Sequence, residues 1–230
     1  MKAMKLNSST KYLLLIVLTF SSHELMAQKR SVSYGNSSPS SISMGVYEPK
    51  GIKSLDTLPA NIRLKVENHL RERLGAEYYS KLVFVSGAVI DLNELYRVEP
   101  NAKNYQWKIH SYELVFKYAD PKKGLKKYYA RTRLDSNGGV MADINLPEVS
   151  KYPQKANIIS IDKAIEIAKE RGLKPKEMNI RVLYDEDIGS LIWIISSFAG
   201  EDKYTSTDRV IRIDAHSAEI LKDGYEGGIK

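Results

Sequence analysis

The sequence predicts an α+β protein made of two tandem modules, each with one helix packed on an antiparallel sheet of three to four strands. In each half of the chain an amphipathic helical segment is followed by segments rich in β-branched and aromatic residues, with turn signals between them. A short motif also recurs near the end of each half, at Arg133–Asp135 and at Arg212–Asp214. A repeat of this size indicates one structural module made twice.

Residues 1–27 predict a secretory signal peptide. Basic residues precede the apolar run Tyr12–Phe20, and Ala27 offers a small residue at the cleavage point. The apolar run is far shorter than the roughly 20 residues that span a bilayer, so we expect no permanent membrane span after cleavage.

The amino-acid composition limits both the cellular compartment in which we expect the protein and the kinds of chemistry open to it. The chain has no cysteine, which excludes disulfides, thiolate metal sites and a thiol nucleophile. It also argues against a lipoprotein anchor, since that anchor needs a cysteine at the cleavage point. We therefore expect an exported protein, periplasmic or extracellular, that is not a lipoprotein. The net charge of +7 is a mild basic excess, and without a binding motif it does not predict nucleic-acid binding.

The first half begins with a tether and a helix. Residues 28–54 are rich in serine and predict a flexible tether. The first module is expected over 55–147. Its helix begins near Leu58 and ends at Gly75. Apolar residues recur every four positions along one face of that helix: Ile62, Val66, Leu70 and Leu74.

Four extended segments follow the helix of the first half, at 81–92, 105–118, 126–135 and 139–146. They are rich in β-branched and aromatic residues, and turn signals separate them. Gly87 inside the first segment predicts a bulge or a bend.

The second half repeats this plan after a proline-containing linker at 148–157. Its module is expected over 158–224, followed by a tail at 225–230. Ser160 predicts the N-cap of the helix and Gly172 its end. Strands are expected at 178–185, 190–198, 207–214 and 218–221. Within them, consecutive apolar residues from Leu191 to Ile195 predict a central strand covered on both faces.

Two motifs in the second half carry a family resemblance. The segment Ile159–Ala168 matches the pattern I-[ST]-x-x-x-A-x-x-x-A, and Ile211–Leu221 matches V-x-[VI]-D-A-x-[ST]-G-E-[IVL]-L. With these motifs, roughly residues 159–222 resemble a PepSY domain. The sequence departs from the pattern at Ala218, where the family has glycine. The resemblance therefore does not determine the geometry of this turn, because alanine adopts a positive φ only at a cost. The first half resembles the family more loosely, with Gly139 at the equivalent position.

The resemblance implies binding without catalysis. PepSY modules occur in propeptides of secreted metallopeptidases, which they are thought to inhibit or chaperone, and in standalone periplasmic or membrane-attached proteins. They carry no known catalytic residues. We therefore expect a non-enzymatic protein without a cofactor that binds a partner protein in the envelope and inhibits or regulates an exported peptidase in trans.

A second hypothesis is a module that binds an envelope polysaccharide or another anionic ligand. It depends on the basic cluster Pro121–Arg131 and its tyrosines. The same cluster also fits a solvated hairpin loop around Gly124, and the aromatic residues also fit cross-strand packing. The candidate ligand or partner surface consists of Tyr105, Trp107, Lys122, Lys123, Lys126, Lys127, Tyr128, Tyr129 and Arg131.

No catalytic, metal or cofactor-binding residues are predicted. The histidines His69, His110 and His216 fall in separate segments without metal-ligand spacing. The acidic stretch Asp185–Asp187 lacks the spacing of a calcium loop and predicts a polar turn. The repeated aspartates of the two closing motifs fit either general acid–base work or the formation of a turn, and the turn is favoured.

Overall fold

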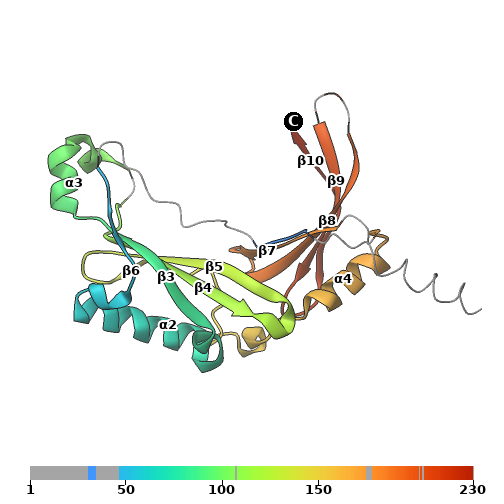
Figure 1. Ribbon diagram of the computed structural model, residues 1–230, viewed down its shortest axis with the longest axis horizontal. Helices are drawn as coiled ribbons and strands as arrows, with labels where there is room; N and C mark the ends of the chain where they lie inside the picture. Colours follow the sequence, from blue (N-terminus) through green and yellow to red (C-terminus); the bar gives the residue numbers. More distant parts are fainter. Residues whose placement is uncertain are drawn as a thin grey trace, which may run out of the picture.

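The computed structural model describes residues 31–34, 47–106, 108–174, 178–201, 203 and 205–229. These residues form a mixed α/β fold in which helices pack on two sheets (Figure 1). The predicted α+β class is confirmed. No helix in this part of the chain combines the length and the apolar character that crossing a membrane requires. The predicted signal peptide, residues 1–27, lies outside the described residues.

The first sheet has the order β2-β3-β4-β5-β6, with every neighbouring pair antiparallel. Its strands are β2 (Lys50–Ile52), β3 (Leu82–Val89), β4 (Tyr112–Asp120), β5 (Leu125–Leu134) and β6 (Val140–Ala142). The helix α2 (Ala60–Ser80) runs along one face of this sheet (Figure 1). The predicted apolar stripe of that helix is buried in the core, each residue at most 2% exposed: Ile62, Val66, Leu70 and Leu74.

The helix α2 does not stop at the predicted residue. Gly75 leaves helical geometry with φ 70°, but the chain resumes a helical course to Ser80. This last stretch carries Tyr78 under the sheet, where its ring stacks on that of Tyr118 at a centroid distance of 4.7 Å. Packing of this buried pair explains why the segment beyond the glycine remains helical.

The second sheet has the order β1-β7-β8-β9-β10, in which β1 is parallel to β7 and the other pairs are antiparallel. Its strands are β1 (Ser31–Tyr34), β7 (Met178–Asp185), β8 (Ser190–Glu201), β9 (Thr205–Asp214) and β10 (Ile220–Ile229). The helix α4 (Ile161–Glu170) contacts β8. As predicted, Ser160 caps this helix, with its Oγ accepting a hydrogen bond from the N–H of Lys163 at 3.2 Å.

The strand β8 is central, as predicted. It is the middle strand of its sheet, and every residue from Leu191 to Ile195 is at most 2% exposed. Alternate side chains of this run enter two different clusters, because neighbouring residues of a strand point to opposite faces. The strand is therefore covered on both sides.

The segment predicted as a strand at 105–118 forms one only from Tyr112. Before it lie α3 (Leu92–Val98) and the 3-10 helix η2 (Pro100–Asn104). These elements make a small lobe with its own apolar cluster, formed by Tyr47, Ile90, Leu95, Ala102 and Ile109. Other 3-10 helices are η1 (Leu55–Thr57), η3 (Pro121–Lys123) and η4 (Pro153–Ala156).

Parts of the predicted tether and tail belong to the sheets. Ser31–Tyr34 pairs with β7, Lys50–Ile52 pairs with β3, and Tyr47 between them is only 7% exposed. The strand β10 continues through the predicted tail to Ile229. Such additions need little apolar sequence, because an existing sheet edge supplies backbone hydrogen-bond partners.

One continuous apolar core joins the two sheets. It contains Leu114 and Phe116 from the first sheet, and Trp193 and Ile211 from the second. The turn between β4 and β5 also packs closely on α4, since a Cβ built on Gly124 would lie 2.2 Å from Cγ2 of Ile161. The two halves are thus packed against each other.

Candidate functional site

The predicted ligand surface does not form one patch. Tyr128 is 1% exposed, and its hydroxyl donates to the carbonyl oxygen of Asn145 at 3.1 Å, so its assignment to a surface was wrong. Its neighbour Tyr129 points to the other side of β5, because successive residues of a strand alternate between faces. Tyr105 follows η2 in the α3 lobe and is 38% exposed. Trp107 lies outside the described residues.

Three of the predicted residues do share a surface, the side of the first sheet that faces away from α2. Lys127, Tyr129 and Arg131 alternate along β5 and point to this side. Tyr129 pairs with Lys117 of β4, which pairs with Val83 of β3. Val83 is 53% exposed, and Lys127 is also exposed. We call these five residues the outer face of the first sheet.

The outer face is predominantly basic. The ammonium of Lys127 lies 6.0 Å from the ring centroid of Tyr129, a favourable cation–π arrangement. Glu113 lies on the same side of the sheet. Its side chain is 4% exposed and accepts a hydrogen bond from Nε of Arg133 at 2.8 Å. Burial lowers the pKa of the adjacent His110, with Arg133 acting in the same direction. One paired carboxylate thus accompanies the cations of this side.

Lys122 and Lys123 lie elsewhere, at the tip of the β4–β5 hairpin, where they line an open pocket of about 340 Å³. Lys126, close to this tip, is exposed. In the pocket, Nζ of Lys81 donates to Asp120 at 2.8 Å and to Glu77 at 3.0 Å. Burial opposes the charge of Lys81, but these two bonds outweigh it and raise its pKa. The pocket is therefore built around a satisfied ion pair.

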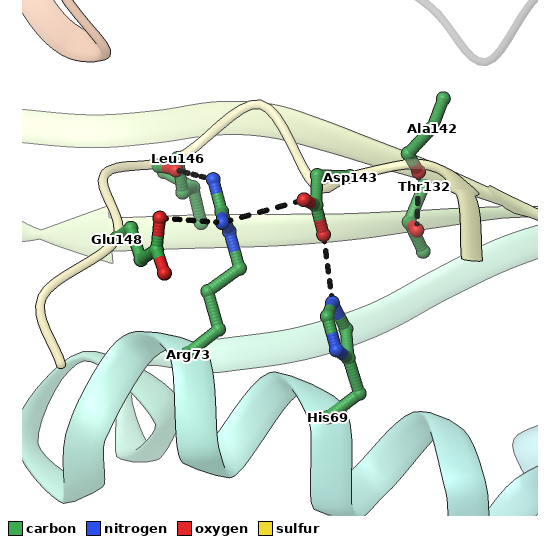
Figure 2. A network of polar contacts seen from close by, with 7 residues as sticks. All are labelled: His69, Arg73, Thr132, Ala142, Asp143, Leu146 and Glu148. Carbon is green, nitrogen blue, oxygen red and sulfur yellow. Dashed lines mark hydrogen bonds and ion pairs between the residues drawn. The ribbon is translucent and has the colours of Figure 1, made fainter. Parts of the chain in front are cut away.

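A polar network ties α2 to the segment after β6, and sequence reasoning did not predict it (Figure 2). Arg73 reaches Asp143 and Glu148, each at 3.4 Å, and its Nη2 donates to the carbonyl of Leu146 at 3.4 Å. His69 contacts the same Asp143 at 2.7 Å. No local pattern could have revealed this network, because its partners are seventy or more positions apart.

The network borders a second pocket of about 270 Å³, to which Tyr184 and Glu186 of the other half contribute. Beside it, Thr132 of β5 donates to the carbonyl of Ala142 at 2.8 Å (Figure 2). Burial raises the pKa of Tyr184. Since Arg73 already has carboxylate partners, the arrangement holds α2 against the segment after β6 rather than presenting a free reactive group.

The two repeated aspartates form turns, as predicted. Oδ1 of Asp135 accepts the N–H groups of Asn137 and Gly139, each at 2.8 Å. Oδ1 of Asp214 accepts those of His216 at 2.7 Å and Ser217 at 2.8 Å. Burial alone would raise the pKa of Asp214, but these backbone hydrogen bonds outweigh it and lower the pKa. Both carboxylates are thus engaged in shaping the chain.

The closing turns differ in length by one residue. In the first turn, the backbone carbonyl of Asp135 accepts a hydrogen bond from the N–H of Gly138, which has φ 80°. In the second turn, the backbone carbonyl of Asp214 accepts a hydrogen bond from the N–H of Ala218. Ala218 has φ 66° and is the one non-glycine residue at positive φ in the described chain. Gly138, not the predicted Gly139, is therefore the counterpart of Ala218. Gly139 is small for a different reason, since a Cβ there would lie 2.6 Å from the Asp135 carboxylate.

Replacing Ala218 by glycine is expected to raise the free energy of unfolding by about 1 kcal/mol, because the strain of a Cβ at positive φ is relieved. For a protein of this size the melting temperature should rise by about 2–4 °C. Chemical denaturation followed by circular dichroism measures the change. The matched control is Gly172→Ala, which should destabilise by a similar amount, because Gly172 has φ 87° and no atom within 4 Å of an added Cβ. Equal stability of Ala218→Gly and the parent protein would contradict the strain assigned to this turn.

In the described part of the chain, no group of three or more histidine, aspartate or glutamate side chains is placed to hold a metal ion. Comparisons with protein-family models, with curated proteins and with solved structures found no match. The PepSY resemblance therefore stays a prediction, carried by the two motifs of the second half.

Proposed function

We propose that the protein is an exported, non-enzymatic PepSY-like protein that binds a partner protein and regulates an exported peptidase in trans. The proposal includes a tandem arrangement of two modules. It is supported by the shared order of elements, in which a helix precedes a meander of strands, β3 to β6 in one half and β7 to β10 in the other. The α3 lobe is an addition to the first module in this proposal.

The observation that carries the binding surface is the outer face of the first sheet. It combines the exposed Val83, the ring of Tyr129 and the cations Lys117, Lys127 and Arg131 on the side opposite α2. Tyrosine and arginine are enriched among residues that dominate protein–protein binding energy. Basic side chains around them favour an acidic partner surface and speed the encounter. We infer that the partner presents an acidic patch with an apolar centre.

A photo-crosslinking amino acid placed at Tyr129 tests this surface in the native envelope. We expect one discrete protein adduct, and a yield at least tenfold lower when Lys127→Glu and Arg131→Glu are added, because like charges then face the partner. The captured protein, once identified, should be a peptidase that the purified protein inhibits or regulates.

The matched control places the same probe at Tyr152, which is 40% exposed and lies beside the cations Lys151 and Lys155. This position shares the basic and aromatic character but belongs to a different surface. Identical adducts at both positions, or no adduct at Tyr129, would refute the proposed surface.

A second candidate function is the binding of an envelope polysaccharide or another anionic ligand. The observation that favours it is the location of Lys122 and Lys123 on the same hairpin as the outer-face cations. Retention on isolated envelope polysaccharide that falls steeply with salt, and that is lost in Lys122→Glu/Lys123→Glu, would support this alternative.

A further inference from the structure

The strand β10 is the last strand of the second sheet. Within the described residues its one paired neighbour is β9, so one long edge carries no partner strand there. It runs for ten residues, from Ile220 to Ile229, and together with β9 it extends away from the body of the molecule (Figure 1).

This edge is neither short nor interrupted by proline, although it carries the charges of Lys222, Asp223 and Glu226. Natural edges are kept short or are blocked by proline, by charges or by bulges. The sequence of β10 contains no proline, and its register shift lies at its beginning, between Ile220 and Lys222. Tyr225 is 63% exposed and Leu221 is 38% exposed. Backbone groups and apolar side chains thus both favour the addition of another strand.

We propose that the added strand is β10 of a second copy of this chain, paired antiparallel about a two-fold axis through Gly224. In this register Lys222 of each copy lies opposite Glu226 of the other, and Asp223 lies opposite Tyr225. Opposite charges directly across a strand pair are stabilising. A two-fold interface requires such self-complementarity, because the same surface serves both copies.

The neighbouring registers are electrostatically worse. Centring the axis on Tyr225 places Lys222 and Glu226 opposite glycines, so no pair of opposite charges forms. Centring the axis on Asp223 instead brings the two aspartates together. Like charges directly opposite one another are destabilising, so the charge pattern of β10 selects the register centred on Gly224.

The charges determine register more than affinity. Within one chain Glu226 already accepts hydrogen bonds from Lys222 and from Arg212, both at 2.8 Å. Pairing with a second copy therefore replaces an ion pair within the chain by one between copies. Both pairs are partly exposed, so the exchange adds little to the affinity. A single pair of edge strands also forms a small interface. The dimer is therefore expected to be weak and dependent on protein concentration.

Sedimentation equilibrium of the purified protein over a concentration series tests the pairing. The parent protein is expected to shift from monomer to dimer as its concentration rises. Lys222→Glu alone and Glu226→Lys alone should each weaken the dimer at least tenfold, because each places like charges across the axis. An equimolar mixture of the two variants should recover a dimer within about threefold of the parent affinity, since both cross-axis pairs are then of opposite charge.

The mixture distinguishes pairing between copies from an effect inside one chain, because an internal defect of either variant is not repaired by mixing. The matched control is Lys163→Glu on α4, which reverses a similarly exposed lysine paired with Glu166 at 2.8 Å; it should leave the dimer unchanged. A protein that stays monomeric throughout, or a mixture that fails to recover, would overturn the proposal. Capture of a foreign strand by a strictly monomeric chain would also overturn it.

Discussion

Replacing Gly124 by alanine is expected to lower the free energy of unfolding by about 3 kcal/mol. Gly124 has φ 80°, and a Cβ there would lie 2.2 Å from Cγ2 and 2.9 Å from Cβ of Ile161. The strain at positive φ costs about 1 kcal/mol, and forcing an extra methyl group into a packed contact costs about 1–3 kcal/mol more. The contact joins the β4–β5 hairpin to the start of α4, so the two halves must separate slightly to accept the methyl group.

Chemical denaturation followed by circular dichroism measures this loss. The matched control is Gly172→Ala, because Gly172 has a similar φ of 87° but no atom within 4 Å of the added Cβ. This control should cost only about 1 kcal/mol. The difference between the two variants isolates the clash with Ile161. Equal losses in both would show that the hairpin does not press on α4.

Replacing Trp193 by alanine is expected to lower the free energy of unfolding by about 3–5 kcal/mol, the usual range when a large aromatic side chain is removed from a core. Trp193 is fully buried and lies on the middle strand of the second sheet. A loss of this size is comparable to half of the stability of many domains. Trp193→Phe should cost less, because the indole Nε1 makes no hydrogen bond in the described structure and most of the volume is retained.

The matched control lies on the same strand. Phe198 is 54% exposed, so Phe198→Ala should change the stability by no more than about 0.5 kcal/mol. Because the core is continuous across both sheets, Trp193→Ala should also lower the unfolding midpoint of the first half. Hydrogen exchange of amides in β4 and β8 measures the two halves separately. Protection lost in β8 alone would contradict a single shared core.

The features that sequence patterns predicted correctly are local. The stripe of α2 and the apolar run Leu191–Ile195 report burial directly, since the period of an element determines which side chains face the core. The N-cap at Ser160 was also predictable, because its Oγ accepts a hydrogen bond from a backbone N–H only three positions away.

The candidate surface was predicted only in part. The sequence marked the β5 hairpin as basic and aromatic, but neighbouring residues of a strand cannot share a face. Tyr128 and Tyr129 look alike in sequence, and the packing on α2 decided that Tyr128 points inward. The first closing turn was also predicted only in part. It is one residue shorter than the second, so the positive φ falls at Gly138 rather than at the predicted Gly139.

The sequence by itself determined the class of the fold, its main helices and strands, the aspartate turns and the absence of cysteine chemistry. These follow from composition and from interactions within a few positions of the chain. Only the tertiary structure decided which side chains form the outer face, which edge of β10 has no partner strand among the described residues and how the halves share one core. Such features depend on the register and packing of segments far apart in sequence, where small shifts of one strand exchange its buried and exposed sides.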